Sequence, residues 1–274
     1  MATLLQKQLW SVLPELRFQP TLKRVRVSLG SDLLADTTRA VLVYEPMRIV
    51  PQYAVPEDDL SVAVQPAAPG PQPDYQPVRF GSDRTPLLDP SVPFAVHTAA
   101  GEAVTVGTGE RVGAGFRFED PDLAGYVSLD FDDFDWREED EPIVSHPRDP
   151  FHRIDVRRSS RRVRIEHEGV VLAESHRPHL LFEATFPVPR YYLPREDVVA
   201  DLAPGTLQTS CAYKGHATHY AVSAGDEVLA DMAWSYEDPL DDAVPVAGLV
   251  SFYQERLDLF LDDELVERVR TPWS

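Results

Sequence analysis

The chain contains one long stretch twice, and this stretch decides the fold. The segment RVRVSLGSDLLADTTRAVLVYEPMRIVPQYAVPEDDL (residues 24–60) aligns without a gap with RVRIEHEGVVLAESHRPHLLFEATFPVPRYYLPREDV (residues 162–198). Identical residues meet in the pairs Arg24/Arg162, Arg26/Arg164, Leu34/Leu172, Ala35/Ala173, Arg39/Arg177, Leu42/Leu180, Glu45/Glu183, Pro51/Pro189, Tyr53/Tyr191, Pro56/Pro194 and Asp59/Asp197. So many matched arginines, prolines and tyrosines indicate an internal duplication.

The same register continues downstream of these segments. FEDPDLAGYVSLDF (residues 118–131) resembles YEDPLDDAVPVAGLVSFY (residues 236–253), and HTAAGEAVTV falls where CAYKGHATHY stands in the second copy. The second copy has side chains that the first has replaced: Cys211, Tyr213 and Lys214 stand where the first copy has His97, Ala99 and Ala100. We therefore expect one scaffold in both copies, with the reactive side chains in the second alone.

The alignment also predicts the domain organisation. We expect an N-terminal helical arm at residues 1–22, a first domain at 23–140, a linker at 141–160 and a second domain at 161–270. A Pro- and Gly-rich insert at about 65–90 interrupts the first domain, and its prolines favour an extended surface loop. An acid-rich run (residues 130–141) and an Arg-rich run (residues 153–164) lie at the linker. They could form an electrostatic clasp or an anion site, or they could be two solvated faces.

Composition excludes several classes of protein. The formal net charge of −19 repels phosphate backbones, so we expect no nucleic-acid partner. A single cysteine excludes an internal disulfide framework and a multi-cysteine zinc site. The sequence has neither a signal-peptide pattern nor an apolar run of about 18 residues, so we expect a cytoplasmic protein without a membrane partner.

Short alternating runs predict a mainly β fold with antiparallel strands. VRVSL, AVLVYE, VRIEHEG, VVLAES and HLLFEA have the strand pattern, and Glu168-Gly169 is a predicted turn. CAYKGHATHYAV and EVLADMAWSYED predict a hairpin around SAGDE, with Cys211 at the start of its strand. The prolines of PVPRYYLPREDV predict a rigid extended arm, which is neither a central strand nor a helix.

Two helices are predicted beside these strands. In DDAVPVAGLVSFYQERL, Asp241 or Asp242 can cap a helix whose apolar face holds Val246, Leu249, Val250 and Tyr253. A second helix is expected around residues 4–13, packed on the first domain. Each domain would then be mainly β with one short helix.

The candidate site is the segment TSCAYKGHATHYAV, residues 209–222. A turn at AYKG, bent at Gly215, would bring the Cys211 thiol to the Lys214 ammonium, which would stabilise a thiolate. The alternative is a buried cysteine that only fills the core. His216 and His219 would face opposite sides of a strand, so we expect no metal site.

Aromatic residues are expected to surround this segment. Tyr191, Tyr213, Trp234 and Tyr236 could line a pocket with polar tips, or they could form a plain aromatic core. Glu183 and Arg177 could pair with each other, and their retention in both copies favours a structural role over a catalytic one. We include both of these charged residues among the candidate ligand-binding residues.

The second copy resembles the DUF427 family, a domain of unknown function. The resemblance rests on LLFEATFPVPRYYLPREDV, CAYKGHATHYAV and AWSYEDPLDDAVPVAGLVSFY, and the first copy is a degenerate match. It implies the Mss4-like, or β-tent, architecture. The matching signature positions are Tyr191, Tyr192, Pro194, Asp197, Cys211, Tyr213, Lys214, Gly215, Trp234 and Tyr236, while Ala212 and His219 depart from the family pattern.

Two functions from different classes fit the sequence. In the first, Cys211 and Lys214 are catalytic residues of an enzyme acting on a small molecule of unknown identity. In the second, the same pocket binds a small metabolite without chemistry, and the first domain is a scaffold or dimer surface. Neither reading requires a cofactor, and both leave a homo-oligomer open.

Overall fold

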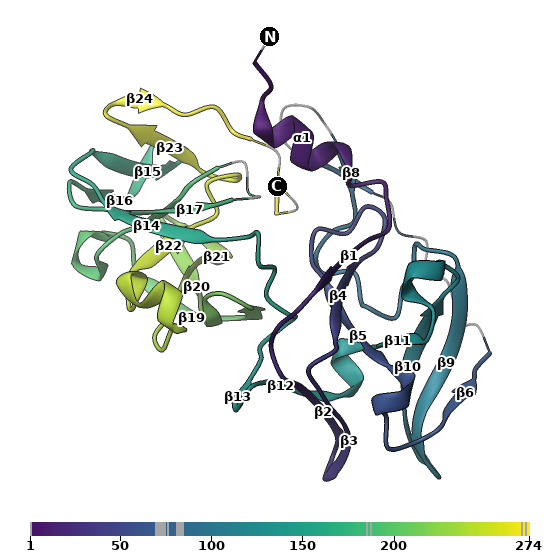
Figure 1. The fold of residues 1–274 in the computed structure, drawn as a ribbon. Helices are drawn as coiled ribbons and strands as arrows, with labels where there is room; N and C mark the ends of the chain where they lie inside the picture. Colours follow the sequence, from purple (N-terminus) through teal and green to yellow (C-terminus); the bar gives the residue numbers. More distant parts are fainter. Residues whose placement is uncertain are drawn as a thin grey trace. The chain divides into compact units, whose positions relative to one another are not determined.

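A computed structural model describes residues 2–68, 75, 77–80, 85–184, 186, 188–269, 271 and 273–274. Part of the predicted Pro-rich insert at about 65–90 lies outside these residues. The chain divides into two compact units. Unit 1 comprises residues 1–79 and 85–149, and unit 2 comprises residues 80–84 and 150–274. The predicted mainly β class is confirmed, because antiparallel sheets make up most of the regular structure (Figure 1).

Unit 1 holds a seven-stranded and a four-stranded antiparallel sheet. The first sheet has the order β1 (Arg17–Pro20), β4 (Val41–Tyr44), β5 (Gln52–Pro56), β11 (Tyr126–Leu129), β10 (Arg111–Phe118), β9 (Gly101–Thr108) and β6 (Val64–Pro66). The second has the order β13 (Glu141–Pro142), β12 (Asp135–Glu138), β2 (Val25–Leu29) and β3 (Asp32–Thr37).

The remaining elements of the first part of the chain are short. They are the helix α1 (Leu5–Ser11), the 3-10 turns η1 (Glu57–Asp59), η2 (Pro121–Leu123) and η3 (Phe131–Asp133), and the paired strands β7 (Val78–Phe80) and β8 (Thr85–Leu87). The helix predicted around residues 4–13 is therefore confirmed. No helix among the described residues is long and apolar enough to cross a bilayer.

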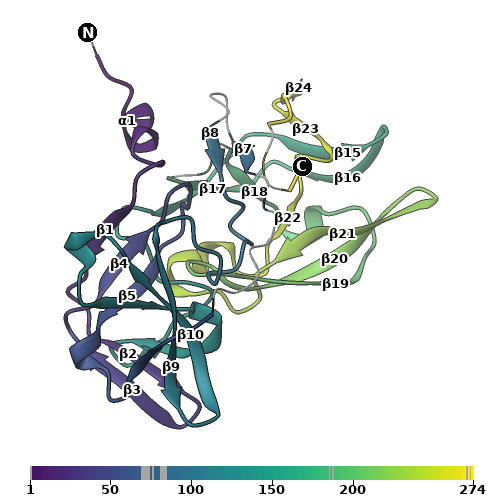
Figure 2. The same cartoon turned by 90° about the vertical axis from the view of Figure 1, so that its right-hand side faces the viewer.

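Unit 2 has a similar set of strands. One sheet has the order β14 (Ile154–Arg158), β17 (His179–Glu183) and β18 (Arg190–Tyr192), and another the order β19 (Leu202–Cys211), β20 (Gly215–Ala224), β21 (Glu227–Ser235) and β22 (Val250–Phe252). The third has the order β16 (Val170–Ser175), β15 (Val163–His167), β23 (Asp258–Leu261) and β24 (Glu264–Leu265). The 3-10 turns are η4 (Arg195–Asp197) and η5 (Asp241–Val246). Figure 2 shows the long strands β19, β20 and β21 side by side.

The order of strands in unit 2 follows that of unit 1. A bridge between Leu193 and Val250 connects the end of β18 to β22, so the first two sheets of unit 2 form one series, β14-β17-β18-β22-β21-β20-β19. Taken in chain order, these strands occupy the same places as β1-β4-β5-β11-β10-β9-β6 in unit 1. The four-stranded sheets of the two units also agree, because β3, β2, β12 and β13 correspond in order to β16, β15, β23 and β24. Each unit encloses its own core, with alternate residues such as Val25 and Val27, or Val163 and Ile165, buried.

The structure corrects three local predictions. The helix predicted after Asp241 is a 3-10 turn of six residues that ends at Val246 and is followed by β22. Gly248 has a φ of +67°, which an α-helix does not allow, so the chain leaves the helical path there. The predicted arm contains a strand, β18, and Leu193 bridges to Val250, because the prolines flank the paired residues. Cys211 ends β19 instead of starting a strand.

Other local predictions are confirmed. Residues 168 and 169 form the turn between β15 and β16, and both have positive φ. The hairpin around SAGDE joins β20 to β21.

Candidate functional site

The candidate site is built on the turn between β19 and β20. Cys211 and Gly215 are opposite each other in the register, so the three residues between them form a tight connection. The backbone N–H of Tyr213 donates to the Cys211 Sγ at 3.5 Å. Gly215 has a φ of +91°, a conformation that side chains with a Cβ rarely adopt. The turn predicted at AYKG is therefore present, and glycine permits its geometry.

Lys214 points from this turn into the interior of unit 2. Its Nζ donates to Oε1 of Glu183 at 2.7 Å, and the lysine side chain is only 9% exposed. Glu183 is the last residue of β17, so the ion pair joins two sheets of the unit. The Lys214 carbonyl accepts a hydrogen bond from the backbone N–H of Leu240 at 3.2 Å, which fixes the turn from its other side.

Electrostatics keep both members of this pair charged. Burial by itself would raise the pKa of Glu183, but the Lys214 ammonium and a contact with His152 lower that pKa to about 2. Burial would lower the pKa of Lys214, yet attraction to Cys211 and then to Glu183 raises it well above its ordinary value. Lys214 is therefore a permanent ammonium at neutral pH, suited to stabilising an anion and not to acting as an amine nucleophile.

Two buried tyrosines interact electrostatically with the same ammonium. Burial raises the pKa of Tyr192 to about 12, although nearby Lys214 partly opposes the shift. Burial likewise raises the pKa of Tyr236 well above its ordinary value, with Lys214 again opposing. Both phenols therefore keep their protons at neutral pH. The Tyr192 hydroxyl accepts a hydrogen bond from Nε1 of Trp234 at 3.3 Å, which orients it.

His152 completes the cluster, and sequence reasoning missed it. Its Nε2 lies 3.6 Å from Oε2 of Glu183, and its ring packs against that of Tyr213 with centroids 4.5 Å apart. The residue belongs to the segment predicted as a linker. Its sequence HPRDPFHR carries no spacing that relates it to Glu183, so only the folded chain brings the two together.

The sequence comparisons support the resemblance for part of the chain. Residues 155–263 match the family described as a domain of unknown function, DUF427. The matched range contains Cys211, Lys214 and Glu183 and leaves out His152. No curated protein matches the chain.

Two of the predicted site residues lie elsewhere or have other partners. Arg177 pairs with Asp197 and Glu196 on the surface instead of with Glu183. Tyr191 and Tyr192 alternate along β18, and the charges that act on Tyr191 are those of Arg161 and Asp262. Tyr192, which was not among the predicted site residues, is therefore the tyrosine of this strand that interacts with Lys214.

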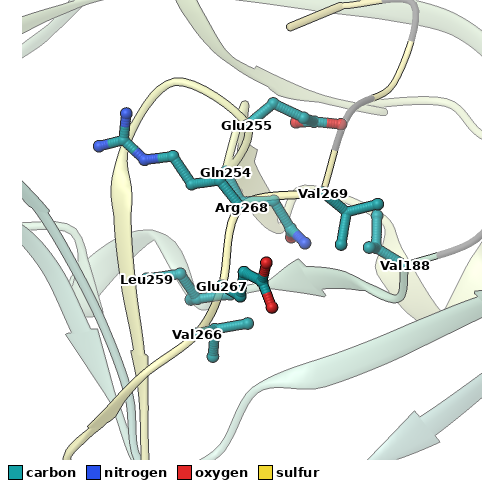
Figure 3. A pocket seen from close by; sticks show the side chains of 8 residues that line it. All are labelled: Val188, Gln254, Glu255, Leu259, Val266, Glu267, Arg268 and Val269. Carbon is teal, nitrogen blue, oxygen red and sulfur yellow. The ribbon is translucent and has the colours of Figure 1, made fainter. Parts of the chain in front are cut away.

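Trp234 belongs to a second buried cluster next to the site. The guanidinium of Arg190 lies 5.5 Å from the centre of the Trp234 ring and forms two hydrogen bonds with Glu255, at 2.6 and 2.8 Å. Thr271 also donates to Glu255 at 2.8 Å. Beside Glu255 lies a pocket with room for about one water molecule, lined by Val188 and by residues 266–269 (Figure 3). This volume is too small for an organic ligand.

The histidines of the candidate segment have hydrogen-bond partners of their own. Nε2 of His219 lies 2.8 Å from the Thr209 hydroxyl, and Nδ1 of His216 lies 2.8 Å from the Ser210 hydroxyl. A different group, His167, Glu168 and Glu227, brings its ligand atoms within 4.8 Å of one another. It lies at the outer ends of two hairpins, and two of its three members are exposed.

Proposed function

We propose that unit 2 is an enzyme in which the Cys211 thiolate attacks the carbonyl carbon of a small molecule. The observation that carries this proposal is the buried Lys214 ammonium. It is held by Glu183 and interacts electrostatically with Cys211. A fixed cation in a site with little water stabilises both a thiolate and a developing oxyanion more strongly than it would in water.

The proposed step is a reversible addition that needs no co-reactant. The sulfur electron pair forms the carbon–sulfur bond while the carbonyl π electrons move to oxygen, which becomes an alkoxide. Lys214 stabilises the negative charge on this oxygen. A protonated phenol, Tyr236 or Tyr192, donates a hydrogen bond to it, and the raised pKa of each tyrosine keeps that proton available. Glu183 and His152 act as positioning residues for the ammonium.

We also propose that the two units are copies of one domain with the Mss4-like architecture. The repeated strand order supports this, as does a hydrogen-bond arrangement found in both units. In unit 1, Thr37 and Arg39 bind the carboxylate of Asp59, and in unit 2 Ser175, Arg177 and Asp197 make the same contacts. Unit 1 has no counterpart of the thiol and the ammonium, so it would act as a scaffold.

Alkylation of the native protein tests the nucleophile. We expect iodoacetamide to modify Cys211 at neutral pH, and to do so about tenfold faster than in the double variant Glu183→Gln/Lys214→Met, because that variant lacks the stabilising cation. The double variant removes both charges together, so its fold is retained better than that of Lys214→Met alone. Circular dichroism checks this point. Equal rates in two folded proteins, or no labelling of either, would contradict the mechanism.

The alternative function is a binding module in which the Cys211 side chain fills space and takes no part in chemistry. It is favoured by the fact that Cys211 is partly buried and lies in contact with its own turn. Here Cys211→Ser should leave the thermal stabilisation by a small aldehyde, such as benzaldehyde, unchanged. The enzyme proposal expects that stabilisation to vanish in Cys211→Ser, so a single comparison separates the two functions.

A further inference from the structure

The four-stranded sheet of unit 1 places two arginines directly opposite each other. Arg26 on β2 and Arg137 on β12 are partners in the antiparallel register. Their neighbours Val27 and Trp136 are buried in the core, so the alternation of the strands directs both arginines to the outer face. Like charges at opposite positions destabilise a strand pair. Asp36, which is opposite Arg26 on β3, and Asp140 offset part of this repulsion, whereas Arg137 has no ion pair among the described residues.

The corresponding sheet of unit 2 has no such repulsion. There the register places Arg164 on β15 opposite Phe260 on β23. The guanidinium stacks on the ring, 4.4 Å from its centre, and Nε of Arg164 lies 2.8 Å from Oε1 of Glu166. Ring and carboxylate both contact the Arg164 guanidinium. Unit 1 has neither, because Arg137 and Ser28 occupy the matching register positions.

A pocket lies on unit 1 where the ring and carboxylate are missing. Its volume is about 450 Å³, within the range typical of sites for small ligands. The two arginines, Ser28 and Asp135 supply polar groups, and Leu33 and Ile143 supply apolar wall. Trp136 also contributes to the lining. The pocket is formed entirely by unit 1 and contains none of the residues around Cys211.

The arginines are held in place while some of their donors stay available. Nε and Nη2 of Arg26 donate to the Glu139 carbonyl, and Nη1 of Arg137 donates to the Asp140 carbonyl at 2.6 Å. Within the described part of the chain, Nη1 of Arg26 and the Nε and Nη2 groups of Arg137 have no hydrogen-bond partner. The free Nε and Nη2 of one guanidinium form the edge that binds a carboxylate through two parallel hydrogen bonds.

The chain itself shows that a carboxylate fits beside these arginines. Oδ1 of Asp140 lies 2.7 Å from Nη2 of Arg26, although the Asp140 side chain is 91% exposed. An exposed ion pair of this kind contributes little stability, so a ligand carboxylate can compete with it. Asp135 and Ser28, which are opposite each other in the register, offer acceptors at the far side for a ligand donor group.

We propose that this pocket of unit 1 binds a small carboxylic acid that carries an apolar group. The carboxylate lies between Arg26 and Arg137 and relieves their repulsion. The apolar group lies against Leu33 and Ile143. In this proposal unit 1 is more than a scaffold, and the two units bind different ligands at different places on a similar fold.

Titration of the full chain with phenylacetate tests the proposal, with calorimetry as the readout. We expect saturable binding that weakens about tenfold or more in Arg137→Phe, which copies the aromatic residue of unit 2 and fills the pocket. The neutral isostere phenylacetamide should bind about tenfold more weakly than phenylacetate. Arg164→Gln, the matched change in unit 2, should leave phenylacetate binding unchanged.

A second variant keeps the test informative if Arg137→Phe fails to fold. Arg137→Gln is polar and close in shape, and it should show a similar loss of affinity with unchanged circular dichroism. Inorganic phosphate should compete only weakly, because it has no apolar group. Equal binding to the wild type and both variants, stronger binding of phosphate than of phenylacetate, or no saturable binding of phenylacetate would each overturn the proposal.

Discussion

Glu45 in unit 1 and Glu183 in unit 2 stand at matching places and are satisfied in different ways. The side chain of Glu45 is completely buried, and its carboxylate accepts hydrogen bonds from Gln52 at 2.8 Å and from the backbone N–H of Thr98 at 2.5 Å. His97 also binds it, with Nδ1 at 2.8 Å. Glu183 instead depends on the Lys214 ammonium and remains 16% exposed.

The difference teaches what makes unit 2 chemically distinctive. In unit 1 the carboxylate is surrounded by donors that hold it in place, and these contacts, with His97 first, lower its pKa against the effect of burial. The nearby Arg48 guanidinium is itself occupied, because it donates to the backbone carbonyls of Val92, Pro93 and Val96. In unit 2 the carboxylate holds an ammonium, and the same ammonium interacts with a thiol and two phenols. Glu45 is thus fully used in structural hydrogen bonds within unit 1. Glu183 instead holds a charged side chain that also interacts with other groups of unit 2.

The largest effect is expected from breaking the ion pair of unit 2. Lys214→Met removes the ammonium from the buried Glu183 carboxylate and leaves only His152 beside it, which should lower the free energy of unfolding by about 3 kcal/mol. Urea titration followed by circular dichroism measures the loss. The additional change Glu183→Gln should restore most of it, because the uncompensated charge is then removed.

An ion pair of unit 1 with an exposed lysine is the control. Lys23 binds Glu138, but the Lys23 side chain is 42% exposed, and Glu138 keeps a hydrogen bond from the Tyr53 hydroxyl at 2.8 Å when the lysine is removed. Lys23→Met should therefore cost at most about 1 kcal/mol. If both lysine substitutions had the same small effect, burial would not be what distinguishes the pair of unit 2.

Sequence reasoning recovered the scaffold better than the partners within the site. Strands and tight turns depend on local alternation and on glycine, so β15, β16 and the turn at Gly215 were predictable. The helix predicted after Asp241 failed because three- and four-residue spacing of apolar groups also occurs in a 3-10 turn that leads into a short buried strand. Neighbours across sheets follow no local pattern. Sequence alone therefore paired Glu183 with Arg177, whereas the fold pairs it with Lys214.

The pH dependence of the unfolding free energy gives a second test of the Glu183–Lys214 pair, with a smaller expected effect. The folded-state pKa of Glu183 is about 2, below the ordinary value of 4.5, so its stabilising contribution is complete above pH 4.5 and is lost as the pH falls toward 2. At pH 3 about 2 kcal/mol of it should be gone. The measurement is the difference in unfolding free energy between wild type and Glu183→Gln, because other carboxylates cancel in that difference. A gap that stays constant from pH 7 to pH 3 would show that Glu183 is not held as a carboxylate by Lys214.

The smallest effect tests the proposed common origin of the units. The Ser175 hydroxyl donates to Asp197 at 2.7 Å and accepts from the backbone N–H of Arg177 at 3.1 Å. Thr37 makes the matching contacts, at 2.5 Å to Asp59 and 2.9 Å from Arg39.

Because both hydroxyls are buried and bonded in the same way, Ser175→Ala and Thr37→Val should each cost about 1 kcal/mol, measured by urea titration. In each unit the contact joins the end of a strand, β3 or β16, to a 3-10 turn, η1 or η4. If the two units are copies of one scaffold, the contact should contribute equally to the stability of both. A clear loss for one substitution and none for the other would mean that the shared geometry does not reflect a shared energetic role. The two units would then share their strand topology but not the stabilising role of this contact.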